Sequence, residues 1–105
     1  MNCDILIPGR NEEFLGRTVQ DILQHIEGDT GVIVVIDGES KFTHDDIPVD
    51  PRVTVVRNKK PLGQRAATNQ ACRLSNAKYI IKCDAHCSFD QGFDRKLMER
   101  MQDDY

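Results

Sequence analysis

An aspartate and a histidine two residues apart, Asp84 and His86, directly follow a short apolar run at 79–81. Such a run with β-branched residues is typical of a strand buried in a parallel sheet. In open α/β sheets, ligands bind just beyond the carboxyl ends of such strands. A carboxylate oxygen and an imidazole nitrogen together suit Mn²⁺, with Mg²⁺ as the alternative ion. The pair therefore predicts a metal site that could hold nucleotide phosphates, against the simpler interpretation of an Asp-rich turn with a solvated histidine.

The cysteines offer a competing interpretation of the same segment, because Cys83 and Cys87 flank His86. Two thiols and an imidazole are zinc ligands. However, their spacing is not a paired Cys-x-x-Cys arrangement, and alternate residues of a strand point to opposite faces. Cys3, Cys72 and Cys83 lie within or beside apolar segments, so we expect buried free thiols at these positions rather than disulfides.

Polar residues also follow two other apolar runs of the chain. Pro8-Gly9 comes after the run at 4–7, and residues 10–13 then open a predicted helix with Asn11 as its N-cap. Asp37-Gly38 comes after the run at 32–36. Because parallel strands end at one edge of a sheet, we expect these residues to meet the Asp84 segment there.

Each of these groups suits one part of a nucleotide. Asp37 is a candidate acceptor for hydrogen bonds from a base or ribose. Backbone amides near Arg10, at the predicted helix N-terminus, could bind polar atoms of the same ligand. Lys59, Lys60 and Arg65 supply positive charge for phosphates.

The elements that position these groups alternate along the chain. Their order is strand, helix, strand, strand, helix, strand, helix, with a polar surface connection at 41–52. This order predicts an α/β fold, a three-layer α/β/α sandwich around a mostly parallel sheet. The predicted strands lie at 4–7, 32–36, 53–56 and 79–81, and the predicted helices at 10–27, 64–76 and from 93 onward.

Length and charge narrow the class of protein. The 105 residues suit a single domain spanning 1–105. The net charge of −3 argues against general binding to nucleic acid or anionic membranes. No apolar run approaches the ~20 residues that span a bilayer, and the first residues lack a secretory signal. We therefore expect a cytoplasmic protein.

Three segments in this order, ILIPGRNE, VVIDGES and CDAHCSFD, resemble the nucleotide-binding half of family 2 glycosyltransferases with the GT-A fold. The resemblance implies that the segment at 8–12, the Asp-Gly turn and a later Gly leading into an Ala-x-Asn helix contact the nucleotide. Asp-Ala-His-Cys most resembles the Asp-x-His-Cys motif of polypeptide N-acetylgalactosaminyltransferases, which makes Asp84 and His86 the implied metal ligands. The predicted nucleotide-binding residues are Pro8, Gly9, Arg10, Asn11, Glu12, Asp37, Gly38, Gly63, Arg65 and Asn69.

The resemblance implies a hexosyltransferase-type enzyme that takes a nucleotide-diphospho-sugar, a UDP-sugar, with a divalent metal and transfers the sugar to an acceptor hydroxyl. Thr68 stands where Arg is common in the family, and no residue is identified as the catalytic base. We expect the C-terminal acceptor half to be absent. A truncated or non-catalytic nucleotide-binding module is therefore the alternative, and an incomplete sheet that exposes apolar surface predicts a homo-oligomer.

Overall fold

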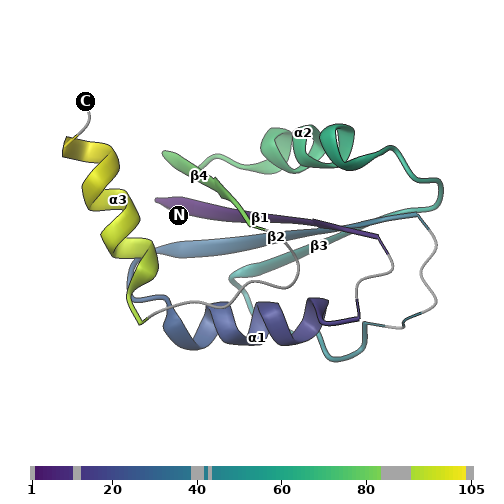
Figure 1. Cartoon of the computed structure of the whole chain (residues 1–105), viewed down its shortest axis with the longest axis horizontal. Coiled ribbons are helices and arrows are strands. Elements are labelled where there is room, and N and C mark those ends of the chain that lie inside the picture. The colour runs from purple at the N-terminus through teal and green to yellow at the C-terminus, as the bar shows by residue number, and fades with distance from the viewer. Residues whose placement is uncertain (1, 11–12, 39–41, 43, 84–90, 104–105) are drawn as a thin grey trace.

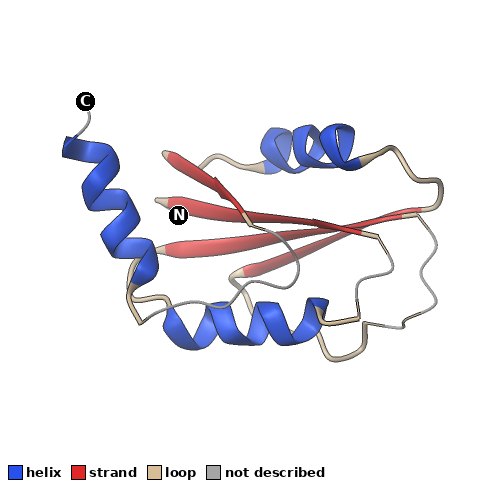
Figure 2. Ribbon diagram, viewed as in Figure 1, coloured by secondary structure: helices blue, strands red, loops and turns tan. Residues whose placement is uncertain are grey.

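The chain is built as three layers in a computed structural model, with a parallel sheet between two helices (Figure 1). The structure describes residues 2–10, 13–38, 42, 44–83 and 91–103, the last three without their side chains. The sheet has the spatial order β3-β2-β1-β4. Its strands are β1 (Cys3–Gly9), β2 (Thr30–Asp37), β3 (Val53–Asn58) and β4 (Tyr79–Lys82), and the helices are α1 (Leu15–His25), α2 (Gln64–Leu74) and α3 (Phe93–Asp103), as Figure 2 shows.

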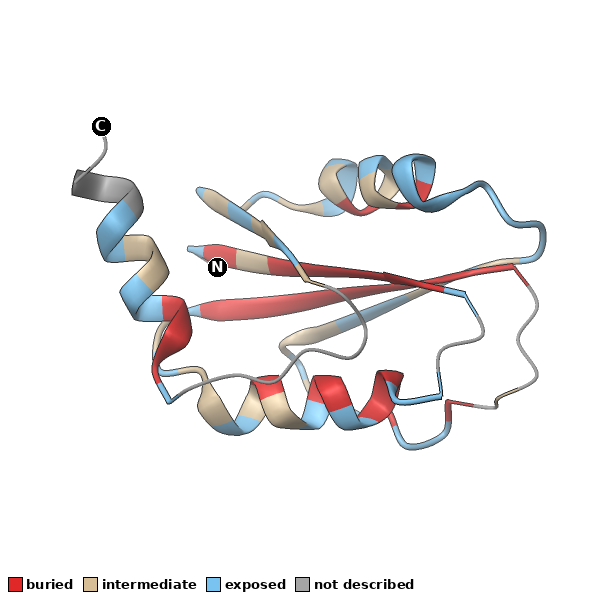
Figure 3. Cartoon of the chain, in the orientation of Figure 1, coloured by how far each residue is buried: buried red, intermediate tan, exposed pale blue. Residues whose placement is uncertain are grey.

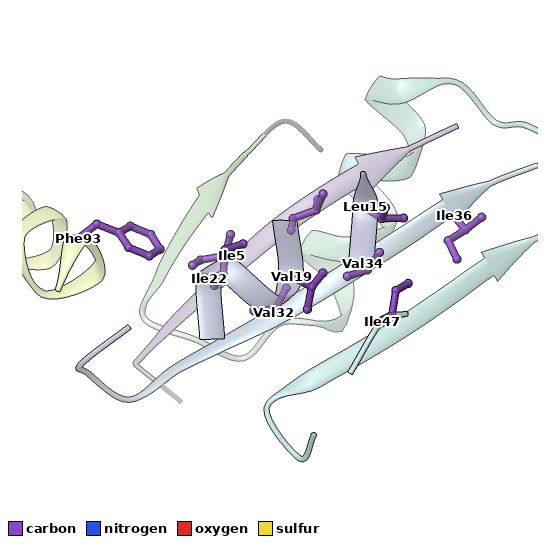
Figure 4. Packing of buried hydrophobic residues seen from close by; sticks show 10 residues of the cluster. Ile5, Leu15, Val19, Ile22, Val32, Val34, Ile36, Ile47 and Phe93 are labelled. Carbon is purple, nitrogen blue, oxygen red and sulfur yellow. The ribbon is translucent and has the colours of Figure 1, made fainter. Parts of the chain in front are cut away.

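Helices α1 and α2 cover opposite faces of the sheet (Figures 1 and 2). The alternation of side chains along each strand therefore feeds two cores, and Figure 3 shows that β1 and β2 are buried along almost their whole length. The predicted α/β class and three-layer parallel sandwich are confirmed. The core on the α1 side (Figure 4) contains Ile5, Ile7, Leu15, Val19, Ile22, Val32, Val34, Ile36, Ile47 and Phe93, and the core on the α2 side contains Leu6, Ile33, Val35, Ala67 and Ala71.

The α2 side is the thinner of the two layers, because its helix contacts the sheet through alanines. Ala67 is fully buried and Ala71 is 1% exposed, so little side-chain volume separates the α2 backbone from β1 and β2. The α1 side instead buries larger side chains, each of which contributes about 1.5–3 kcal/mol to stability.

Strand β1 continues through Pro8 and Gly9, although this pair was predicted to end it. The register explains why a proline is tolerated in a central strand. Strand β4 ends at Lys82 opposite Leu6, and the Leu6 carbonyl accepts a hydrogen bond of 2.9 Å from the Cys83 N–H. Pro8, two residues further along β1, faces the position beyond the end of β4, so its missing N–H removes no ladder hydrogen bond.

Helix α1 begins at Leu15, later than the predicted start at 10–13. Its N-cap is Phe14, whose carbonyl accepts hydrogen bonds from the Thr18 N–H and hydroxyl at 2.9 and 3.0 Å. The helix begins where its buried face begins, because Leu15 is fully buried whereas Phe14 is 45% exposed. The backbone near Arg10 is therefore not a helix N-terminus, and Asn11 lies outside the described residues.

Two further expectations about burial were wrong. The run at 79–81 was predicted to be a fully buried strand, but β4 lies at an edge of the described sheet and Ile80 is 40% exposed. The connection at 41–52 was predicted to lie on the surface, but His44 and Ile47 are buried. Ile47 joins the core on the α1 side, where it packs with the residues shown in Figure 4.

Helix α3 lies across the amino ends of the strands, the end opposite the carboxyl edge (Figure 1). Asp94 in its first turn is fully buried. Its carboxylate accepts hydrogen bonds from the N–H groups of Glu27 and Gly28 at 3.0 and 2.8 Å and from the Thr30 hydroxyl at 2.5 Å. This carboxylate therefore fastens α3 to the loop between α1 and β2.

Candidate functional site

A cavity of about 280 Å³ opens at the carboxyl ends of β1 and β2, beside the amino end of α2. It contains five of the residues that the sequence assigned to a nucleotide, contributed by three separate segments of the chain. The prediction that the residues after the first two strands meet at one edge is confirmed for 8–10 and Asp37, whereas the Asp84 segment lies outside the described residues. The lining residues are Pro8, Gly9, Arg10, Asp37, Gly63, Gln64 and Ala67.

The end of β1 supplies one wall of the cavity. Pro8 and Gly9 are buried and carry no flexible side chain into the space, whereas Arg10 is exposed. Because the absence of a side chain at Gly9 leaves its backbone accessible, a ligand can approach this strand closely. Arg10 then brings a permanent positive charge to the rim, where it can pair with phosphate oxygens.

Asp37, the last residue of β2, is 4% exposed and holds the loop that leads into α2. Its Oδ1 accepts hydrogen bonds from the Leu62 N–H at 2.8 Å and from the Asn58 side-chain amide at 3.3 Å. Its Oδ2 accepts a hydrogen bond from the Gly63 N–H at 2.9 Å. A carboxylate has about four acceptor positions, so one on Oδ2 remains for a ligand.

The protonation of Asp37 follows from these contacts. Burial alone would raise the pKa of its carboxyl group. The hydrogen bonds from Leu62, Asn58 and Gly63, together with the charge of Arg10, outweigh burial and hold the pKa of Asp37 below its ordinary value. The cavity therefore presents an ionised acceptor at neutral pH, next to the cation of Arg10.

Asn58 and Gln70 join the end of β3 to the middle of α2 by a reciprocal pair of hydrogen bonds. The Asn58 amide donates to the Gln70 carbonyl oxygen at 2.8 Å, and the Gln70 amide donates back to Asn58 at 3.1 Å. Since Asn58 also donates to Asp37, one connected network of side chains fixes α2 against the carboxyl edge. Neither residue was predicted to belong to the site.

Glycines form the turns on both sides of this network. Gly63 is the N-cap of α2, with φ of 92° and ψ of 156°, a conformation that is essentially restricted to glycine. Gly38 has φ of 88°, and a Cβ there would lie 3.1 Å from the Cβ of Pro61. The turn after β2 can therefore pack tightly against the loop before α2.

Among the residues that the structure describes, three predicted nucleotide-binding residues do not line this cavity: Gly38, Arg65 and Asn69. Arg65 and Asn69 are exposed and lie on the side of α2 away from the buried Ala67. Asn11, Glu12, Asp84 and His86 lie outside the described residues. Sequence reasoning missed Gln64 and Ala67, although the position of both at the start of a helix with small residues was a usable signal.

Cys3, Cys72 and Cys83 form no disulfide, as predicted, but only Cys3 is buried, whereas Cys72 and Cys83 are partly exposed. Burial, followed by the charges of Asp94 and Asp4, raises the pKa of Cys3 to about 11, so this thiol stays protonated at neutral pH. No cluster of three His, Cys, Asp or Glu side chains suited to a metal occurs among the described residues. Cys87 and His86 of the alternative zinc interpretation lie outside them.

Comparisons with known proteins bear on the fold and the family. The chain is similar to crystal structures of TarS from S. aureus: a structure of its residues 1–349 matches with a TM-score of 0.82 at 14% identity, and a second with a TM-score of 0.78 at 12% identity. Each match covers 98% of this chain but only 33% and 20% of the TarS chains. At such identities the similarity shows the fold alone, and it agrees with the predicted GT-A architecture. No curated protein sequence matches the chain.

The character of the helices and the family match of the sequence bear on the remaining predictions. Within the described part of the chain, no helix has the combination of length and apolar character needed to cross a bilayer. The sequence model of glycosyl transferase family 2 matches residues 4–105, almost the entire chain. That match includes all three segments that carried the sequence resemblance. The chain therefore belongs to glycosyl transferase family 2.

Proposed function

We propose that the chain binds a nucleotide-diphospho-sugar, a UDP-sugar, in the cavity at the carboxyl ends of β1 and β2, and that it transfers the sugar to an acceptor hydroxyl. The cavity itself is the observation that carries the proposal. It gathers Pro8, Gly9, Arg10, Asp37 and Gly63, which the sequence had assigned to the nucleotide from three separate motifs. Sites of this kind, at the carboxyl edge of a parallel sheet, are where α/β folds bind nucleotides.

The chemistry of the lining supports a nucleotide with a charged diphosphate. The remaining acceptor position on Asp37 suits the N–H of a uracil or a ribose hydroxyl. Arg10 at the rim, with the exposed Lys59 and Lys60 in the loop before α2, provides charge for phosphate oxygens. A nucleotide base would lie near Asp37, with its phosphates toward these cations.

A divalent ion, Mn²⁺ or Mg²⁺, is part of the proposal, with Asp84 and His86 as its ligands. One carboxylate oxygen and one imidazole nitrogen are a donor set that suits Mn²⁺. These residues follow β4, which runs parallel to β1 and therefore ends toward the same edge of the sheet as the cavity. When bound, the ion would supply positive charge to the diphosphate.

The proposed reaction is a displacement at the anomeric carbon of the donor sugar. The acceptor oxygen forms a bond to that carbon while the bond to the diphosphate oxygen breaks with its electron pair, and the hydroxyl proton passes to solvent water. UDP then carries additional negative charge, which Arg10 and the neighbouring lysines stabilise. The contribution of the described residues is thus to bind the nucleotide and to stabilise its departure.

Isothermal titration of the chain with UDP, with and without Mn²⁺, tests the binding step, and hydrolysis of UDP-sugars tests turnover. We expect Mn²⁺-dependent UDP binding that Arg10→Gln weakens about tenfold or more, because a charge-assisted hydrogen bond is lost. Arg17→Gln is the matched control, since Arg17 is an exposed arginine on α1 and does not line the cavity.

The outcomes separate the two candidate functions. UDP binding together with turnover supports a glycosyltransferase. UDP binding without any turnover supports the alternative, a nucleotide-binding module. An absence of UDP binding, or equal losses in the Arg10 and Arg17 variants, contradicts the proposed site.

A further inference from the structure

Charge is distributed very unevenly along this chain. Residues 59–83 contain six of its 14 Lys and Arg residues and none of its 17 Asp and Glu residues. This segment forms α2, which covers one face of the sheet, and β4, the strand beside β1, with the loops around them in the upper part of Figure 1. A net charge of −3 therefore conceals one cationic segment in an otherwise acidic domain.

The part of this segment that includes the end of α2 and all of β4 combines cations with exposed apolar side chains. We define the α2–β4 patch as Arg73, Leu74, Lys78, Ile80 and Lys82, all of which are exposed. Leu74 is 51% exposed at the last residue of α2, and Ile80 is 40% exposed on β4. Figure 3 shows exposed residues on α2 and on β4 at this end of the molecule.

The register of the sheet places the patch on one side. Ile80 and Lys82 pair with Asp4 and Leu6 of β1, and Leu6 packs against the buried alanines of α2. Residues paired in a parallel ladder point to the same face, so Ile80 and Lys82 also lie on the α2 side. Four residues, 75–78, connect the end of α2 to the start of β4, and the hydrogen bond from Ser75 to Asp4, the partner of Ile80, ties this connection to the sheet.

The charges of the patch are available to a partner. Asp4, the carboxylate paired with Ile80, accepts a hydrogen bond from the Ser75 hydroxyl at 2.5 Å. Lys78 lies 5.3 Å from the centre of its neighbouring Tyr79 ring, a contact that leaves its charge unpaired by an acid. The ion pairs between described side chains, His25–Asp21 and Arg52–Asp50, both lie elsewhere.

We propose that the α2–β4 patch docks this domain on the surface of a membrane rich in anionic lipid. Lysine and arginine near such a surface each strengthen binding about fivefold, and exposed Leu and Ile side chains can enter the interface between headgroups and acyl chains. A soluble polyanion would pair with the cations but would not bury the apolar side chains of Leu74 and Ile80. Single-stranded nucleic acid binds through bases that stack on exposed aromatic rings. Among the described residues, the large exposed aromatic side chain is Phe14, the N-cap of α1, which does not belong to the patch.

The position of the patch is compatible with an open nucleotide cavity. Gln64 and Ala67, which line the cavity, lie in the first turn of α2, whereas Leu74 is its last residue. The cavity and the patch are therefore separated along the axis of the helix. A domain docked through the patch keeps the carboxyl edge of the sheet accessible.

Co-sedimentation with vesicles tests this inference directly. We expect the chain to bind vesicles of equimolar phosphatidylcholine and phosphatidylglycerol, to ignore phosphatidylcholine alone, and to dissociate at high salt. The triple variant R73Q/K78Q/K82Q should bind on the order of a hundredfold more weakly, from about fivefold for each charge. The control R95Q/K96Q/R100Q removes three exposed cations from α3 and should change binding less than about threefold.

A second pair of variants tests the apolar part of the patch. Leu74→Ser and Ile80→Thr should each reduce the vesicle binding that remains at high salt, because this part of the binding comes from apolar contacts. Thermal melting checks that each variant folds. Equal losses in the patch and α3 triple variants would overturn the proposal. So would binding to heparin without binding to anionic vesicles, or a dimer through β4 that removes vesicle binding.

Discussion

The Oδ2 atom of Asp37 accepts a hydrogen bond of 2.9 Å from the backbone N–H of Gly63, 26 residues further along the chain. Through this contact the end of β2 holds the first residue of the turn into α2. The loop between β3 and α2 therefore has its position determined by a side chain of a different strand. Both residues line the cavity, so the same contact that supports the fold also shapes the proposed site.

Asp37→Asn should destabilise the fold by about 1–3 kcal/mol. The substituted amide would direct donor hydrogens at one of the two backbone N–H groups, of Leu62 or Gly63, that the carboxylate now accepts. Urea denaturation measures the change. Asp45→Asn, at an exposed aspartate, serves as the control and should change stability by less than about 0.5 kcal/mol. Equal effects of the two substitutions would show that Asp37 does not hold the loop.

The amide pair Asn58–Gln70 should show energetic coupling. In a double-mutant cycle of Asn58→Ala and Gln70→Ala, we expect a coupling free energy of about 0.5–1.5 kcal/mol, because each substitution leaves the other amide without its partner. The same variants should weaken UDP binding, since the pair fixes α2 beside the cavity. Additive effects on stability would argue that the two side chains act independently.

Gly63→Ala should cost about 1–3 kcal/mol through backbone strain alone. No heavy atom lies within 4 Å of a Cβ added at this position, so steric overlap does not contribute. Gly38→Ala provides a comparison with a similar φ of 88°, where the added Cβ also meets Pro61 at 3.1 Å. Thermal melting should therefore rank Gly38→Ala as the more damaging change, and the reverse order would contradict the geometry of the two turns.

Stability should fall in acid because of Asp94 and Asp37. Burial alone would raise the pKa of Asp94, but hydrogen bonds from Thr30 and from the backbone of Glu27, Gly28 and Arg95 hold the pKa of its carboxyl group below the ordinary value. A carboxyl group with a lowered pKa in the folded state stabilises the fold fully above its unfolded pKa of about 3.9. That stability is lost as the pH falls through the lower, folded pKa.

The free energy of unfolding should decline in two stages. The first lies below about pH 6.5, because burial lowers the pKa of His44 and the unfolded chain takes up that proton first. The second lies below about pH 4, where the carboxyl groups act. Urea denaturation at each pH gives the curve. Asp94→Asn should make the acid decline shallower, because one of the contributing carboxylates is gone. A decline of the same steepness in the variant and the original chain would show that Asp94 has no part in it.

The parts of this fold that follow from local pattern could be predicted from sequence. The apolar, β-branched runs at 32–36 and 53–56 predicted strands that the structure contains. The residues after the first two strands were expected to meet because parallel strands share an edge, whereas Gly63 was assigned to the nucleotide by the family resemblance. Contacts between distant segments left no local trace. Asp94 accepts hydrogen bonds from residues about 65 positions earlier, and the Asn58–Gln70 pair becomes visible only when α2 lies on the sheet.

Net charge was similarly uninformative about surfaces. The overall value of −3 argued against binding to anionic partners, yet it averages a cationic segment at 59–83 with an acidic remainder. Whether such charges lie on one part of the surface depends on which elements fold next to each other. In this chain α2 packs on β1 and β2, and β4 pairs with β1, so two elements that are consecutive in sequence both lie beside β1.

Paramagnetic broadening of amide NMR signals by Mn²⁺ and UDP together tests whether the nucleotide binds in the cavity at the carboxyl ends of β1 and β2. With Mg²⁺ and UDP as the diamagnetic reference, the amide signals of Gly9, Gly63 and Gln64 should broaden together with those next to the proposed ligands Asp84 and His86. Those of α3 should stay sharp, because α3 lies at the opposite end of the sheet. Broadening centred on α3, or broadening by Mn²⁺ that is the same with and without UDP, would contradict the proposed site.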